Sequence, residues 1–425
     1  MNLKPIAPEH ISKHAKLFLT AAVLNGIGNG IFGVVMQLYF AGRGIGSSTL
    51  GSILLMNALG AAILTIPVGI LADRYGKKKM IALGMISVLT SIGLILFGNN
   101  VLPYKLGFFA IGISNAAGVV LSPIYSSFFS DEDMDKAFGL YGAINIVTVA
   151  AGSLLGFIPP LMVDRYGLTL QTSYWAFMAL GAAFFLLQYV FYFDSLKGYE
   201  DASNGRGFNF NLESKDLIVK ISLVQALSAV AFGVFFSLFP FYVNKKFGLE
   251  SDALGALFFA SYFFSAGAQA ISPRISQRFG SFKTITLAYA LATPFYLLIP
   301  LAPDFGWLSV LYIARLSLVN LVQPLLGSSL MKGLKEEEKA TANSIRMMSM
   351  QCGGVIGPWL GGVIMERASL ELPAYIGGSL YALLSLSLFI ITIGKETIQK
   401  NTPVVETPLE ESLQGDYGLP LDSDE

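Results

Sequence analysis

Three polar side chains inside long apolar stretches are the first candidates for chemistry in this sequence. Arg315 lies in the stretch 307–331, where a cation costs about 2.5 to 3.5 kcal/mol on insertion scales. That cost indicates either contact with a substrate or a water-filled structural niche. Asn25 and Asn29 are four residues apart in the stretch 17–40, so a helix places both amides on one face. There they would hydrogen-bond either a ligand or a neighbouring helix.

Residues for catalysis or metal binding are missing from the apolar stretches. His10 and His14 precede the first stretch, and none of the stretches contains Asp or Glu. A nucleophile with its base, a cluster of metal ligands and a proton-coupling acid at mid-membrane depth are therefore not expected. No G-x-x-x-x-G-K-S/T loop for a nucleotide-driven pump occurs. We expect no enzyme, no bound metal and no cofactor.

The apolar stretches themselves indicate a membrane protein. The chain is 54% hydrophobic and 13% charged, whereas soluble domains carry about 25% charged residues. A net charge of +0 and the lack of a basic stripe argue against a nucleic-acid partner. Each stretch is near the ~20 residues needed to cross a bilayer. The twelve stretches are 17–40, 50–72, 80–97, 106–129, 137–163, 173–193, 221–243, 254–271, 284–301, 307–331, 340–365 and 374–393.

The order of these stretches predicts two similar halves. Residues 17–193 and 217–394 would each form a bundle of six helices, joined by the polar segment 194–216. Residues 1–16 form a short N-terminal segment. Residues 395–425 are acidic, contain prolines and have few large apolar side chains, so we expect a disordered tail.

Basic residues give the orientation. With the N-terminus inside, 20 Lys and Arg residues fall on the inner side and 6 on the outer side. Because basic residues are retained in the cytoplasm, both termini should be cytoplasmic, with an even number of spans. We expect a multi-pass monomer in the plasma membrane.

A charged turn between the second and third stretches carries the most specific pattern. After Pro67 it contains Gly69, Leu71, Ala72, Asp73, Arg74, Gly76, Lys77, Lys78 and Lys79. The pattern resembles the major facilitator superfamily signature G-x-L-A-D-R-x-G-K/R-K/R-K/R at every fixed position. Glycines let helix ends approach closely, and a carboxylate at the membrane edge can face a cation or another helix's N-terminus.

The resemblance implies an all-α fold with two pseudo-symmetric six-helix bundles that expose a central site alternately to each side. It also implies that Asp73 and Arg74, with Gly69, Gly76 and Lys77, form a latch. This latch would hold the two halves together on the cytoplasmic side when the cavity faces outward. The alternative is that the basic turn only fixes the topology.

A weaker copy of the same turn lies 204 residues later. Gln277, Arg278 and Gly280 align with Asp73, Arg74 and Gly76, which predicts an internal repeat. Because an amide replaces the acid, a latch in the second half should be weaker.

Glycines in the eleventh stretch repeat a pattern in the fifth. The pair Gly152 and Gly156 recurs 201 residues later, in a stretch similar to the superfamily's G-x-x-x-G-P-x-x-G-G antiporter pattern. That pattern belongs in the fifth stretch, which lacks its Gly-Pro step, so it supports export only weakly. Close helix packing explains both stretches. The residues in the eleventh are Gly353, Gly357, Pro358 and Gly361.

The superfamily's cavity is lined by the first, fourth, seventh and tenth spans, and the resemblance assigns polar residues to it. These are Asn25, Asn29, Asn115, Gln225, Arg315 and Gln323. The fourth stretch is apolar around Ile111, where many proton-coupled members carry Arg. We expect transport of a small organic molecule, favouring efflux of an amphipathic compound. The alternatives are uptake or exchange of an organic anion through Arg315, or a membrane receptor that does not transport its ligand.

Overall fold

The computed structural model describes residues 11–130, 133–197, 214–332 and 336–401, and every regular element in these ranges is a helix. Eleven helical segments are long and apolar enough to span a membrane. The twelfth long helix is α14 (Glu336–Arg367), which coincides with the predicted stretch 340–365. The expected all-α membrane fold is confirmed. A helix suits this setting because it satisfies its own backbone hydrogen bonds in lipid.

The first bundle contains α1 (Lys13–Gly42), α2 (Ser47–Tyr75), α3 (Lys77–Phe97), α4 (Val101–Ala117), α5 (Leu121–Ser126), α6 (Met134–Leu154), α7 (Ile158–Tyr166) and α8 (Leu170–Ser195). The second bundle contains α9 (Lys215–Phe235), α10 (Phe239–Phe247), α11 (Ser251–Phe279), α12 (Ser281–Leu298), α13 (Phe305–Lys332), α14 and α15 (Leu372–Asn401). Short 3-10 turns join α4 to α5, α6 to α7 and α9 to α10.

The repeat predicted from the charged turns is present in the backbone. Helices α2 and α11 each have 29 residues, and each ends at a glycine with positive φ, 94° at Gly76 and 84° at Gly280. Glycine adopts this conformation without a Cβ clash. The side chains repeat too, with Arg74 5.4 Å above the ring of Tyr75 and Arg278 5.5 Å above that of Phe279.

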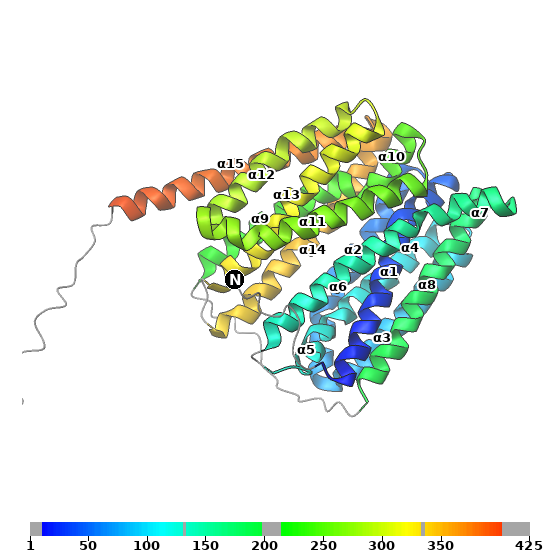
Figure 1. Ribbon diagram of the computed structural model, residues 1–425, viewed down its shortest axis with the longest axis horizontal. Coiled ribbons are helices and arrows are strands. Elements are labelled where there is room, and N and C mark those ends of the chain that lie inside the picture. The colour runs from blue at the N-terminus through cyan, green and yellow to red at the C-terminus, as the bar shows by residue number, and fades with distance from the viewer. Residues whose placement is uncertain (1–10, 131–132, 198–213, 333–335, 402–425) are drawn as a thin grey trace, which may run out of the picture.

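The two bundles meet at one end and diverge at the other, as Figure 1 shows. We call the diverging end, which holds the starts of α1 and α9 and the end of α15, the terminal face. The other end, at α7 and α10, is the opposite face. Contacts between bundles run mainly along two helix pairs, α2 with α14 and α6 with α11.

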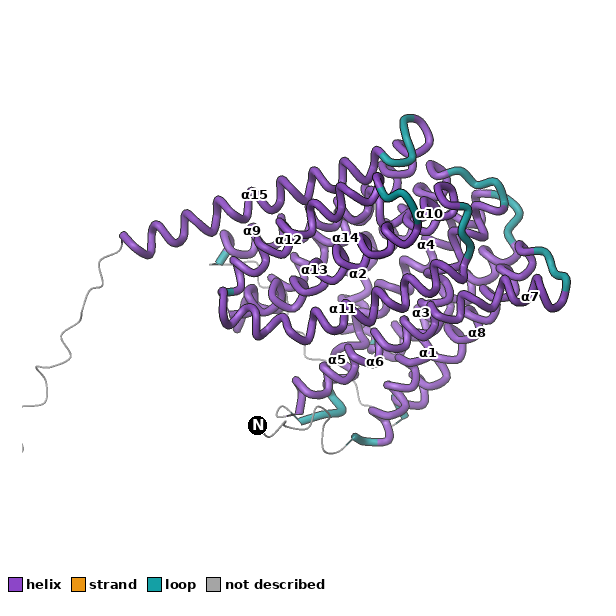
Figure 2. The backbone as a smooth tube through the Cα atoms, turned by 45° about the horizontal axis from the view of Figure 1, so that its top comes forward, coloured by secondary structure: helices purple, strands orange, loops and turns teal. Residues whose placement is uncertain are grey.

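Glycines on these interface helices locate the contact. Near the opposite face, a Cβ on Gly51 or Gly156 would overlap a backbone oxygen of the other bundle. Nearer the terminal face, a Cβ on Gly69, Gly142 or Gly267 would meet no atom of the described residues within 4 Å. The bundles therefore touch at the opposite face and stand apart at the terminal face. The smooth tube in Figure 2 shows the same arrangement from another angle.

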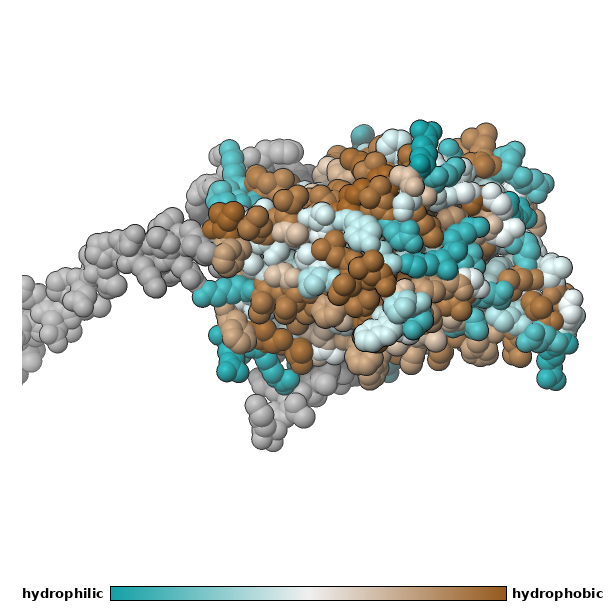
Figure 3. Space-filling model, turned by 90° about the horizontal axis from the view of Figure 1, so that it is seen from above, coloured by the Kyte–Doolittle hydropathy of each residue, from teal (hydrophilic) through white to brown (hydrophobic). Residues whose placement is uncertain are grey.

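The outer surface is strongly apolar. Large side chains there are more than half exposed, including Phe97, Phe263 and Trp307. Figure 3 shows hydrophobic residues covering much of one face, with hydrophilic residues at both ends and in a band through its middle. A soluble monomer rarely exposes so large an apolar area, so this surface suits lipid contact.

The C-terminal helix is longer than the sequence suggested. Helix α15 continues to Asn401, whereas the tail was expected to begin at 395. No glycine or proline interrupts 395–401, and Pro403 follows, which disfavours helix at the preceding residue. The rest of the predicted tail, 402–425, lies outside the described residues.

Candidate functional site

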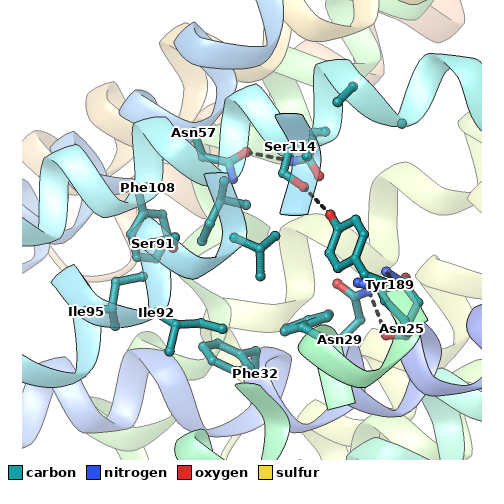
Figure 4. Close-up of a pocket in the computed structure, with 18 of the residues that line it drawn as sticks. Asn25, Asn29, Phe32, Asn57, Ser91, Ile92, Ile95, Phe108, Ser114 and Tyr189 are labelled. Carbon is teal, nitrogen blue, oxygen red and sulfur yellow. Dashed lines mark hydrogen bonds between the residues drawn. The ribbon is translucent and has the colours of Figure 1, made fainter. Parts of the chain in front are cut away.

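A cavity of about 490 Å³ lies inside the first bundle, between α1, α2, α3, α4 and α8. Figure 4 shows its lining. None of the lining residues in the described part of the chain is charged. Its polar side chains are uncharged amides and hydroxyls, namely Asn25, Asn29, Asn57, Ser91, Ser114, Asn115, Gln188, Tyr189 and Tyr192.

A chain of amides crosses the cavity wall from α1 to α8. Asn29 donates from Nδ2 to Oδ1 of Asn25 at 2.7 Å, and Asn25 donates from Nδ2 to Oε1 of Gln188 at 2.8 Å. Asn25 is half-buried and Asn29 is exposed to the cavity. Hydrogen bonding thus fixes the amides of Asn25 and Gln188 relative to each other. The Asn29 side chain is placed to meet a ligand.

Another group of polar residues comes from α2, α4 and α8. Ser114 and Tyr189 share a hydrogen bond of 3.1 Å between their hydroxyl oxygens. Asn115 donates from Nδ2 to Oδ1 of Asn57 over 3.4 Å, which is a long and therefore weak bond. These amides can be redirected to a ligand at small cost.

The remaining wall is apolar. Phe32, Ile92, Ile95 and Phe108 surround the space in Figure 4. The ring of Phe32 also lies 5.4 Å from that of Phe185. An apolar body with a few uncharged hydrogen-bonding groups matches this lining.

Arg315 does not line this cavity. It has 0% exposure inside the second bundle, and its guanidinium carbon lies 3.9 Å from the ring centroid of Phe236, 4.9 Å from that of Tyr381 and 5.2 Å from that of Tyr296. Its Nη2 donates to the Tyr381 hydroxyl, while Nε and Nη1 have no partner among the described residues. Aromatic faces stabilise the cation here.

Gln225 and Gln323 also lie away from the cavity. Gln225 is 2% exposed on α9, and Gln323 is half-buried on α13. The structure therefore brings together three of the six residues assigned to the cavity, Asn25, Asn29 and Asn115.

Sequence reasoning missed several lining residues because it considered only four spans. Asn57, Gln188 and Tyr189 come from the second and sixth spans. A usable signal existed, since Gln188 is the single amide in the stretch 173–193. Ser114 and Ser91 carry no comparable signal, because serine is common in membrane helices.

The proposed latch residues lie at the terminal face. The side chain of Asp73 is outside the described part of the structure. Arg74 is exposed, stacked on its own neighbour Tyr75, and Gly69 has open space beside it. The equivalent Gln277 is exposed on α11. Among the described side chains of these turns, Arg74 contacts its own bundle, and the latch stays a prediction.

At the opposite face the two bundles are joined by direct hydrogen bonds. Gln37 of α1 is 6% exposed. Its Nε2 donates to the carbonyl oxygen of Ser237 at 2.7 Å, and its Oε1 accepts from the backbone N–H of Phe241 at 3.2 Å. Ser47 of α2 donates from Oγ to the carbonyl oxygen of Gly362 at 2.9 Å.

The glycines of α14 lie against α9 and α2. A Cβ on Gly353 would be 2.5 Å from the Ala226 carbonyl oxygen, and one on Gly361 would overlap that of Val234. Gly357 faces Gly233, with a Cβ position 2.6 Å from its Cα. The carbonyl of Pro358 faces Gly51 of the other bundle. Small residues here permit close backbone approach.

Two helical bundles that are joined at one face and apart at the other, with an uncharged cavity inside the first bundle, define a polytopic membrane transporter. The Major Facilitator Superfamily model matches residues 18–341 and 221–415. The chain belongs to the Major Facilitator Superfamily, and it is a membrane transport protein rather than an enzyme.

Solved structures of similar fold are transporters. The nucleoside transporter NupG has a TM-score of 0.68 at 12% identity, covering 90% of this chain and 99% of that one. A bacterial homolog of the human lysosomal transporter Spinster, in an inward-facing and occupied conformation, has a TM-score of 0.67 at 15% identity, covering 90% of this chain and 94% of that one. These low identities support the fold alone.

A sequence relative is an uncharacterized MFS-type transporter, MJ1560, of Methanocaldococcus jannaschii. It is 27% identical over 158 residues, which are 37% of this chain and 40% of the relative. The match thus spans less than half of that protein's length.

Proposed function

We propose that this protein exports an uncharged amphipathic organic molecule across the plasma membrane by alternating access, acting as a monomer. The observation that carries the proposal is the lining of the first-bundle cavity, which combines amides and hydroxyls with apolar walls and has no charge among its described residues. A charged substrate would lose its hydration there without gaining an ion partner.

The position of Arg315 supports a neutral substrate over an organic anion. Its guanidinium is fully buried against aromatic rings of the second bundle, so an anion would have to displace this packing. The cavity amides, by contrast, already face open space. Uptake or exchange of an anion through Arg315 is the competing function.

The arrangement of the bundles supports export when combined with the proposed orientation. If both termini are cytoplasmic, the terminal face points into the cell. The bundles are apart at that face, which leaves the cavity able to load from the cytoplasm. Asp73 and Arg74 would then meet the second bundle after the halves rock together at the terminal face.

A ligand screen by thermal unfolding tests the substrate class. Neutral amphipathic compounds should raise the unfolding temperature by mass action, while organic anions should not. Asn29→Ala should weaken binding about 2- to 13-fold, the loss of one uncharged hydrogen bond of about 0.5 to 1.5 kcal/mol. Arg315→Lys should leave the dissociation constant unchanged. Stabilisation by anions that Arg315→Lys abolishes would instead establish the anion function.

Transport and its direction are tested by flux measurements in cells and membrane vesicles. The identified ligand should leave whole cells faster when the protein is present, and should accumulate in inside-out vesicles. Asn29→Ala should slow both, and Asn244→Ala, remote from the cavity, should slow neither. Binding without any flux would identify a receptor and contradict transport of that ligand. Uptake into right-side-out vesicles would reverse the proposed direction.

A further inference from the structure

The apolar and polar residues of the first-bundle cavity lie at different depths. On α1, Met36 and Phe32 line the cavity about 9 and 15 Å from the end of the helix at Gly42, at about 1.5 Å per residue. Asn29 and Asn25 are about 20 and 26 Å from the same end. This helix ends at the opposite face, so the apolar residues lie closer to that face than the amides do.

Helix α4, which runs in the other direction, shows the same order. It begins at Val101 near the opposite face. Phe108 lies about 10 Å along it and Ser114 about 20 Å. In Figure 4, Phe108 and Ile95 lie on one side of the space and Asn29 lies on the other. The cavity therefore has an apolar end toward the opposite face and a polar layer farther from it.

The apolar end is closed by aromatic packing. The ring of Phe40 lies 6.1 Å from that of Phe108 and 4.9 Å from that of Tyr104. Phe40 is 0% exposed and Tyr104 is 2% exposed. A ligand in this end therefore meets side chains on all sides and displaces the water that would hydrate an apolar group.

Hydrogen-bonding groups are scarce in the apolar end. Among the described lining residues at this depth, Ser91 is the one polar side chain, and it is 3% exposed. Asn57 of α2 reaches the polar layer, where its amide accepts from Asn115. A hydrogen-bonding head in the apolar end would lose water without gaining enough partners, whereas a hydrocarbon group would gain. The apolar lining includes Phe32, Met36, Ile92, Ile95, Phe108 and Ile111.

Two glycines of the lining show on which side of the polar layer there is room. A Cβ on Gly33, about 14 Å from the end of α1, would meet no atom of the described residues within 4 Å. Gly84 lies nearer the terminal face, on α3. A Cβ there would be 3.1 Å from the hydroxyl oxygen of Tyr189 and 3.4 Å from the Cβ of Ala117. Free space for a chain is thus at the apolar end.

We infer that the substrate is an uncharged amphiphile with a single hydrocarbon chain, bound with its head at Asn25 and Asn29 and its chain in the apolar end. This inference rests on the export function proposed above and adds the class and orientation of the substrate. Asn29 and Met36 are about 10 Å apart along α1. A C–C single bond is about 1.5 Å long, so the apolar end takes a chain of roughly eight carbons. The whole cavity, about 490 Å³, is near the lower end of the range for ligand pockets, which favours one chain over two.

A series of monoacylglycerols, from the butyryl to the myristoyl ester, tests the inference on the full-length protein in lipid nanodiscs. These probes share one uncharged head and differ only in chain length. Affinity should rise about fourfold per methylene, equivalent to about 0.8 kcal/mol, until the apolar end is full. Longer chains also partition into the lipid. The ratio of variant to parent dissociation constants is therefore compared at each length, because partitioning cancels in this ratio.

Gly33→Leu fills the apolar end from α1. Its ratio should stay near unity for the butyryl ester and rise about 16-fold for the octanoyl ester, the loss of two methylenes at about fourfold each. Gly93→Leu is the matched control, because a Cβ there also meets no described atom within 4 Å and Gly93 does not line the cavity. Its ratios should stay near unity throughout. Asn29→Ala should raise the dissociation constant by the same factor at every length, because it contacts the head.

Phe108→Ala should act in the opposite sense and lengthen the chain that binds most tightly. Phe177→Ala truncates another buried phenylalanine of the same bundle, outside the lining, and should leave the preferred length unchanged. If Phe108→Ala fails to fold, Phe108→Leu makes a smaller change of the same sign.

Three results would contradict the inference, and they differ in what they leave standing. A Gly33→Leu ratio that is the same at every chain length would overturn the placement of the chain and leave the proposed function intact. Binding of uncharged compounds that lack a chain, without binding of any monoacylglycerol, would overturn the substrate class alone. Failure of every uncharged compound to bind would refute the proposed function as well.

Discussion

Oε2 of Glu366 accepts a hydrogen bond of 2.8 Å from the backbone N–H of Ser48. Glu366 lies in the last turn of α14, and Ser48 lies in the first turn of α2, so an acid of one bundle caps a helix of the other. The positive end of the α2 dipole favours this carboxylate. The latch proposed for Asp73 would place an acid at the other end of the same antiparallel pair, α2 and α14. There the acid would belong to α2 instead of α14.

Glu366→Gln should loosen the opposite face. The substitution removes the charge that faces the α2 N-terminus, an interaction of about 0.3 to 1 kcal/mol at an exposed site, and should therefore raise the ratio of open to closed opposite faces about two- to fivefold. Distance distributions between nitroxide labels on loops 167–169 and 368–371 would measure it. Cys352 is exposed and would first be replaced by Ser.

Glu371→Gln is the control for this change. Glu371 lies on the same face but pairs with Lys246 of its own bundle at 3.6 Å, so its substitution should leave the distances unchanged. Equal shifts in the two variants would show a general charge effect and contradict the specific cap.

Gln37→Leu should open the same face more strongly. It leaves the part-buried carbonyl of Ser237 and the buried N–H of Phe241 without these partners, and each buried orphaned group costs about 1 to 3 kcal/mol. The label distances should lengthen, with little change within either bundle. Gln171→Leu is the comparison, because Gln171 donates to the carbonyl oxygen of Tyr39 in its own bundle at 3.1 Å. Unaltered distances in Gln37→Leu would count against a bridging role.

Gly361→Ala should destabilise the second bundle. The new Cβ would overlap the Val234 carbonyl oxygen of α9, and overpacking of this kind costs about 1 to 3 kcal/mol. Gly354→Ala, on the same helix, meets nothing within 4 Å and should be neutral or stabilising by up to about 1 kcal/mol. Thermal unfolding of both variants measures the difference, and equal unfolding temperatures would argue against tight α9 to α14 packing.

Closure of the opposite face should depend on pH through Glu250, which precedes α11. Burial, followed by the nearby carboxylates of Asp252 and Asp164, raises the pKa of Glu250 above 4.5. Asp164 belongs to the first bundle, so this repulsion acts between the bundles. The Glu250 carboxyl then binds its proton more tightly when the opposite face is closed than when it is open. Closure is therefore favoured fully below pH 4.5 and progressively lost as pH rises through the raised pKa.

The label distances measured across this pH range would check the effect. They should lengthen as pH rises in the parent protein and stay short in Glu250→Gln, which lacks the titrating group. Glu371→Gln should retain the parent's pH response. A Glu250→Gln variant that still opens with rising pH would assign the titration to other groups.

The sequence by itself determined the membrane class, the long helices, the repeat and the superfamily. Apolar length decides whether a segment spans lipid, and the turn at Gly69 to Lys79 has a pattern that specifies its family. The 204-residue offset between the two turns even reappears in the ends of α2 and α11. Each of these properties depends on a contiguous segment of sequence, so it can be predicted without knowing the tertiary contacts of that segment.

Only the tertiary structure decided which polar residues share a cavity. A membrane helix is apolar around its whole circumference, so periodicity does not tell which face points inward. Asn29 and Gln188 come together through packing of α1 on α8. Arg315 is enclosed by the rings of Phe236, Tyr296 and Tyr381 from three helices. No local pattern predicts that enclosure, because these partners are 19 to 79 residues away in the chain.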